Sequence, residues 1–184
     1  MRRLRHEEIP RLQPQALSEV VRHPITILME NIRSAHNVGS ILRTADALRL
    51  ERVYCCGFTP DGSHRAVHKA ALGAQDTVPW SHEQDALELV RRLKLEGYTI
   101  AALEITDSPS DASILTEATF PLCIIAGNEI MGVSDDLIEE CDLALELPQF
   151  GVKQSLNVSV ATGVMLYDVV RSFRSMRPSF IASI

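Results

Sequence analysis

Residues 24–48 read P-I-T-I-L-M-E-N-I-R-S-A-H-N-V-G-S-I-L-R-T-A-D-A-L, an apolar run followed by a segment of helical spacing. This order decides the fold, because it recurs along the chain. Comparable apolar, β-branched runs occur at 52–58, 98–104, 120–127 and 142–148. Most of them are continuously apolar, which is typical of strands that are buried on both faces.

Segments with helical spacing follow these runs, and the chain alternates strand and helix. The expected helices cover residues 38–48, 63–72, 84–96, 134–140 and 156–174. The alternation predicts an α/β fold with a mostly parallel sheet flanked by helices, in which ligands bind beyond the carboxyl ends of the strands. We expect helix caps at Asn37, Ser81, Ser134, and Ser155 or Asn157.

The composition indicates a globular protein with one domain. The chain has 184 residues, of which 46% are hydrophobic, and its apolar runs are too short to cross a membrane. No secretory signal is evident at the amino terminus, so we expect a cytoplasmic protein. The net charge of −6 argues against binding nucleic acid through overall charge, although arginines at the amino terminus leave room for a local basic patch.

Cysteine and histidine do not form a pattern typical of a metal site. The four cysteines fall mostly in apolar runs and contain no C-x-x-C pair, so we interpret them as reduced core residues. His64 and His68 are four residues apart, but no third ligand accompanies them. We therefore expect no bound metal.

Three of the strand-to-helix loops carry polar groups that an ordinary turn does not need. Capping alone accounts for Asn37, Ser155 and Asn157, and the turn around Glu129 resembles many others. Arg43 is harder to explain in this way, because it lies on an apolar helix where a guanidinium needs a carboxylate or phosphate partner. Glu129 is the candidate partner if the two loops lie side by side.

Taken together, the three loops resemble a known family. The segments N-x5-R (37–43), G-N-E-x-x-G (127–132) and S-L-N-V-S-V-A (155–161) are similar to motifs one, two and three of the SpoU (TrmH-type) RNA ribose 2′-O-methyltransferases of the SPOUT superfamily. The segment K-A-A-L-G-A (69–74) also resembles this family, and the similarity covers about residues 24–172.

The resemblance implies transfer of a methyl group from S-adenosylmethionine to a ribose 2′-hydroxyl of tRNA or rRNA. It also implies a C-terminal deep trefoil knot and a homodimer. By motif matching, the expected catalytic residues are Arg43, Asn37, Glu129, Ser155 and Asn157. The expected cofactor-binding residues are Leu103, Gly127, Leu147 and Leu156. The alternative is a knotted module that binds RNA or the cofactor without catalytic activity.

We expect three regions along the chain. Residues 1–23 would form a basic, helical amino-terminal extension, 24–175 the methyltransferase domain and 176–184 a tail. Small side chains between residues 158 and 169 predict that the last helix packs closely against another backbone, and a second subunit is the expected partner. The resemblance implies that Arg43 is the base. A guanidinium normally stays protonated, however, so our own hypothesis is that Arg43 holds an RNA phosphate next to the target ribose.

Overall fold

The computed structural model describes residues 1–9, 21–178 and 180. Within them, a parallel sheet of seven strands has the order β3-β2-β1-β6-β4-β7-β5. The strands are β1 (His23–Glu30), β2 (Leu50–Cys56), β3 (Trp80–Glu83), β4 (Thr99–Leu103), β5 (Pro109–Ser110), β6 (Leu122–Ala126) and β7 (Leu143–Leu145). The α-helices are α1 (Ala35–Ala47), α2 (Arg65–Ala71), α3 (Ala86–Leu95), α4 (Asp135–Glu140) and α5 (Val158–Met176). Short 3-10 turns occur at His6–Glu8, Ala74–Asp76, Ala112–Ile114 and Glu117–Thr119.

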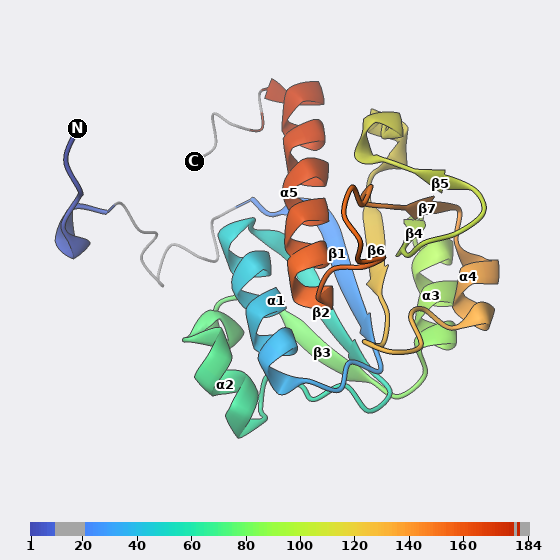
Figure 1. The fold of residues 1–184 in the computed structure, drawn as a ribbon, viewed down its shortest axis with the longest axis horizontal. Helices are drawn as coiled ribbons and strands as arrows, with labels where there is room; N and C mark the ends of the chain where they lie inside the picture. The colour runs from blue at the N-terminus through green and yellow to red at the C-terminus, as the bar shows by residue number, and fades with distance from the viewer. Residues whose placement is uncertain (10–20, 179, 181–184) are drawn as a thin grey trace.

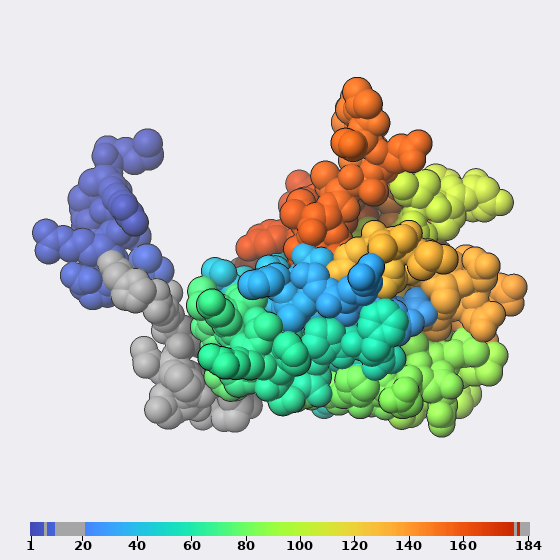
Figure 2. Space-filling model, turned by 60° about the horizontal axis from the view of Figure 1, so that its bottom comes forward, coloured from blue at the N-terminus to red at the C-terminus, as the bar shows by residue number. Residues whose placement is uncertain are grey.

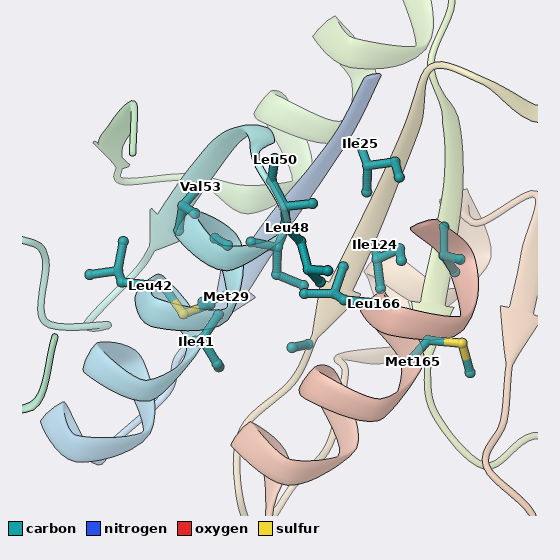
Figure 3. Close-up of a cluster of buried hydrophobic side chains, with 14 of the residues drawn as sticks. Ile25, Met29, Ile41, Leu42, Leu48, Leu50, Val53, Ile124, Met165 and Leu166 are labelled. Carbon is teal, nitrogen blue, oxygen red and sulfur yellow. The ribbon is translucent and has the colours of Figure 1, made fainter. Parts of the chain in front are cut away.

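Helices cover both faces of the sheet (Figure 1). On one face, α1 and α5 pack over β1, with α2 against α1, and Figure 3 shows Met29, Ile41 and Leu166 among the side chains of this core. On the other face, α3 and α4 cover Leu28 and its neighbours. Ile27 and Met29 belong to the first cluster and Leu28 to the second, as expected for a strand whose side chains alternate between two buried faces.

The five apolar runs form β1, β2, β4, β6 and β7, which confirms the predicted α/β class with a parallel sheet. The sequence did not reveal β3 and β5, the two strands at the edges of the sheet. An edge strand can remain partly exposed and therefore need not be apolar. Every residue of β3 is at least partly exposed, and the polar residue His82 is its most exposed one.

Two predicted helix caps are wrong. Ser81 lies within β3, and Asp85 caps α3 by accepting a hydrogen bond from the Glu88 N–H (3.0 Å). Asn37 lies inside α1, because that helix starts earlier than expected and is capped by Ser34. The expected caps at Ser134 and Asn157 are confirmed as positions, although only the Asn157 side chain makes a capping hydrogen bond.

The two ends of the chain are described only in part. In the amino-terminal extension a 3-10 turn covers His6–Glu8, while residues 10–20 lie outside the described residues, so the helical extension stays a prediction. Of the expected tail, residues 179 and 181–184 also lie outside them.

All four cysteines are free thiols. Across the described ranges no helix is both long and apolar enough for a membrane span, and no three metal-binding side chains cluster.

Candidate active site

A pocket of about 370 Å³ opens at the carboxyl ends of β4, β6 and β7, where the start of α5 forms one wall. Figure 2 shows an orange segment that projects from the rest of the surface. The loop between β7 and α5 contains Phe150 and Val152, which are almost fully exposed. The pocket wall contains most of the residues that the sequence singled out. These are Leu103, Gly127, Glu129, Leu147, Ser155, Leu156 and Asn157.

Glu129 joins the loop after β6 to the start of α1. Its carboxylate accepts hydrogen bonds from the main-chain N–H groups of Arg33 (2.8 Å) and Ser34 (3.0 Å) and from the Asn37 side-chain amide (2.9 Å). Burial raises the pKa of Glu129, but these donors outweigh it, so the pKa lies below its ordinary value. The carboxylate is therefore ionised and fixed in place.

Asn37 links Glu129 to the start of α5. Its amide nitrogen donates to Glu129, and its oxygen accepts from the Asn157 side-chain amide (3.2 Å). A carboxylate only accepts hydrogen bonds, so the Glu129 contact fixes the orientation of the Asn37 amide. Asn157 in turn accepts from the Ser159 N–H (2.9 Å) and hydroxyl (2.7 Å). One chain of hydrogen bonds thus connects all three polar loops.

A tight turn between Gly127 and Gly132 shapes the floor of the pocket. Asn128 and Gly132 exchange main-chain hydrogen bonds of 2.9 Å, and a Cβ added at Gly127 would lie 2.2 Å from the Gly132 carbonyl carbon. Gly132 has a positive φ of 72°, which favours glycine. A side chain at Gly127 would force the turn to move, whereas one at Gly132 would meet the Glu104 carboxylate.

Sequence reasoning missed two residues of this site. The Asn128 side chain donates to the Asn31 carbonyl (2.7 Å) and accepts from the main chain of Ile130 and Met131 (2.9 and 3.1 Å). The Glu104 carboxylate accepts from the Val133 N–H (3.0 Å) and lines the pocket. Their place in the sequence could have identified both residues, because Glu104 closely follows the buried strand β4 and Asn128 the buried strand β6.

Arg43 lies apart from this pocket, and its predicted pairing with Glu129 is wrong. It lies six positions after Asn37, which at about 100° per residue turns its side chain roughly 240° around the helix. Arg43 is exposed and lines a second hollow of about 280 Å³ with Ser40, Thr44, Ala47 and Tyr167. Among the described residues it forms no hydrogen bond or ion pair.

The chemistry of the pocket suits a small ligand with an apolar, flat part and a polar part. Leu103, Leu147 and Leu156 provide an apolar surface at the ends of two strands and before α5. Polar groups of the turn at 127–132 and of the α5 start face the same space. A volume of this size is typical of pockets that hold a nucleoside-sized molecule.

The amino-acid sequence of this chain is similar to those of known proteins. The model of the SpoU rRNA methylase family matches residues 24–167. A tRNA (guanosine(18)-2′-O)-methyltransferase of Escherichia coli is 33% identical over 147 residues, covering 80% of this chain and 63% of the relative. The chain therefore spans less than two thirds of that protein. A tRNA (guanosine(18)-2′-O)-methyltransferase of Thermus thermophilus is 32% identical over 158 residues, covering 84% of this chain and 80% of the relative.

Solved structures have the same fold. The crystal structure of the A. aeolicus TrmH/SpoU tRNA modifying enzyme superimposes with a TM-score of 0.80 at 26% identity, over 91% of this chain and 85% of that one. An AdoMet-bound rRNA methyltransferase from Sinorhizobium meliloti gives a TM-score of 0.75 at 25% identity, over 84% and 59% of the two chains.

Proposed function

The chain belongs to the SpoU rRNA methylase family, and from this premise we propose that it methylates a ribose 2′-hydroxyl of tRNA or rRNA with S-adenosylmethionine. One observation carries the proposal: residues of all three motifs meet around one pocket, joined through Glu129, Asn37 and Asn157. The relatives named for tRNA methylation and the AdoMet-bound neighbour support the same substrate and cofactor. RNA substrates of this kind favour a cytoplasmic location.

We assign the pocket residues to the cofactor. Leu103, Leu147 and Leu156 would hold the adenine, and the turn at Gly127 would approach it with main-chain atoms, since no side chain intervenes there. When bound, the cofactor supplies a methyl group on a sulfonium. The hydrogen bonds of Asn37 to Glu129 and to Asn157 hold the loop after β6 in place relative to the start of α5. Ser155 contributes a hydroxyl to the lining of the pocket.

Arg43 has a different task in this proposal. A ribose hydroxyl becomes a good nucleophile only as its proton leaves, and a guanidinium is not a base at neutral pH. Arg43 is exposed and has no protein partner among the described residues, so its donors are available for an RNA phosphate. That contact orients the ribose, and the phosphate or water accepts the proton.

We also propose a homodimer in which Arg43 faces the pocket of the other subunit. Val160, Val164 and Tyr167 recur at helical spacing on α5 and are 51%, 45% and 59% exposed. Tyr167 also lines the hollow that contains Arg43. Such an exposed apolar stripe is typical of an interface. In a dimer of this kind, the guanidinium that each pocket lacks would come from the other copy.

The expected trefoil knot remains part of the proposal. Two contacts support it: the Glu146 N–H donates to the Ser110 carbonyl (2.8 Å), and the Ser172 hydroxyl donates to the Ala112 carbonyl (3.4 Å). The chain after β7 and the helix α5 thus both touch the long connection between β4 and β6.

The test incubates the purified chain with radiolabelled S-adenosylmethionine and either total tRNA or ribosomal RNA, and then maps the labelled nucleoside. We expect label in a 2′-O-methylated nucleoside from one RNA class and its loss in the Asn157→Ala variant. Binding of RNA or cofactor without any label would favour the binding module instead. Label on a base rather than a ribose would refute the proposed reaction.

A further inference from the structure

Every ionisable side chain that lines the pocket is acidic. Glu104 follows β4, Glu129 follows β6 and Glu146 follows β7, so three separate strands bring carboxylates to the same space. Among the described residues, no lysine, arginine or histidine lines this pocket. The pocket therefore carries a formal charge of about −3, since glutamate is ordinarily an anion at neutral pH.

Two of these carboxylates accept hydrogen bonds from main-chain donors. Glu129 accepts three hydrogen bonds, as described above, and Glu104 accepts from Val133 N (3.0 Å) and from Ile105 N (2.9 Å). Glu146 is partly buried, and within the described ranges its side chain makes no hydrogen bond or ion pair, so its charge is not neutralised by the protein.

The methyl donor and its product differ in charge more than in shape. S-adenosylmethionine has a sulfonium, and S-adenosylhomocysteine has a neutral thioether with one methyl group fewer. The adenosine and the amino-acid end, including its carboxylate, are common to both and cancel in a comparison of their affinities. Apolar contacts of Leu103, Leu147 and Leu156 with adenine thus cannot separate the two ligands.

We propose that Glu104, Glu129 and Glu146 make the pocket charge-selective, so that it binds the cationic methyl donor more tightly than the neutral product. This inference rests on the proposed function, because it assigns the pocket to that cofactor. The consequence is that methyl transfer itself weakens retention of the ligand, which promotes product release. In a water-like dielectric, a carboxylate that lay about 7 Å from a sulfonium would contribute roughly threefold to the ratio of affinities.

The test is isothermal titration of the full chain with each ligand separately at low ionic strength. The measured quantity is the ratio of the Kd of S-adenosylhomocysteine to the Kd of S-adenosylmethionine. We expect a ratio well above one that falls about threefold in Glu146→Gln and in Glu104→Gln. The matched control is Glu139→Gln on α4, a glutamate outside the pocket, which should leave the ratio unchanged.

A measurement without substitutions provides an independent check. Salt screens partly exposed charges, so the ratio in the wild-type chain should fall as ionic strength rises. Equal affinities for the two ligands, or a ratio that neither salt nor Glu146→Gln alters, would overturn the charge selectivity while leaving the proposed function intact. If neither ligand bound the wild-type chain, both the selectivity and the proposed function would fail.

Discussion

The Glu129 carboxylate accepts three hydrogen bonds, and its replacement tests how much these bonds contribute to stability and to methylation. In Glu129→Gln one carboxylate oxygen becomes an NH₂ group, which faces donors that need an acceptor. The donors and Glu129 itself are partly or fully exposed, so each lost hydrogen bond costs about 0.5–1.5 kcal/mol. We expect a loss of stability of this order, measured by urea unfolding, and at least a tenfold slower single-turnover methylation. Wild-type values for both would contradict this role.

His23 gives the fold a pH dependence. Its ring is 2% exposed, contacts the Leu48 carbonyl through Nδ1 (2.6 Å) and packs against Phe173. Burial, assisted by Arg49 and Arg174, lowers the pKa of His23 below 6.5. The unfolded chain therefore binds this proton more readily, so stability is complete above pH 6.5 and is lost as the pH falls below that value.

Thermal unfolding between about pH 7.5 and 5 checks this expectation. His23→Gln cannot take up the proton, so its melting temperature should vary less with pH than that of the wild type. His36→Gln, at an exposed position on α1, should retain the wild-type slope. The same slope in all three proteins would show that another group causes the dependence.

At the scale of elements, the sequence predicted the strands that are buried on both faces of the sheet, because such strands are apolar along their whole length. The long apolar runs form the inner strands, whereas the partly exposed β3 and the two-residue β5 lack that signal. The loops of the pocket were predicted by their motifs. The separation of Arg43 from Glu129 was not predicted. The spacing of Asn37 and Arg43 places them on different faces of α1, but which of these faces meets Glu129 depends on how the helix packs in the fold.

The turn from Gly127 to Gly132 is the element that most constrains the pocket. In Gly127→Ala the added methyl would meet main-chain atoms of Gly132 and Val133 at 2.2 Å, so the turn must move. Overpacking of this kind costs about 1–3 kcal/mol. We expect a lower melting temperature and at least tenfold weaker cofactor binding by titration.

Gly151→Ala is the matched control for this prediction. Gly151 lies in the loop before α5, and a methyl added there would have no atom within 4 Å. Its stability and cofactor affinity should remain close to those of the wild type. Equal effects of the two substitutions would mean that the close approach at Gly127 has no special role.

At the scale of the whole molecule, the residues proposed for the site lie on two surfaces of the chain. Asn37 and Arg43 lie on the same helix, yet one contacts the pocket through Glu129 and Asn157 and the other lies in a separate hollow beside α5. Within the described residues, no arginine of a single copy lines the pocket, and Arg43 lines a separate hollow. Two copies related by a twofold axis would supply both parts twice.

This division predicts complementation between two inactive variants. Arg43→Ala keeps an intact pocket, and Asn157→Ala keeps an intact Arg43, so a mixed dimer contains one complete site if Arg43 acts on the other subunit. After the two variants are mixed, unfolded and refolded together, random pairing gives half mixed dimers, and methylation should recover to about a quarter of the wild-type rate. Each variant refolded alone is the control. If mixed dimers form, as shown by mass spectrometry, but the mixture is no more active than its components, Arg43 does not act across the interface.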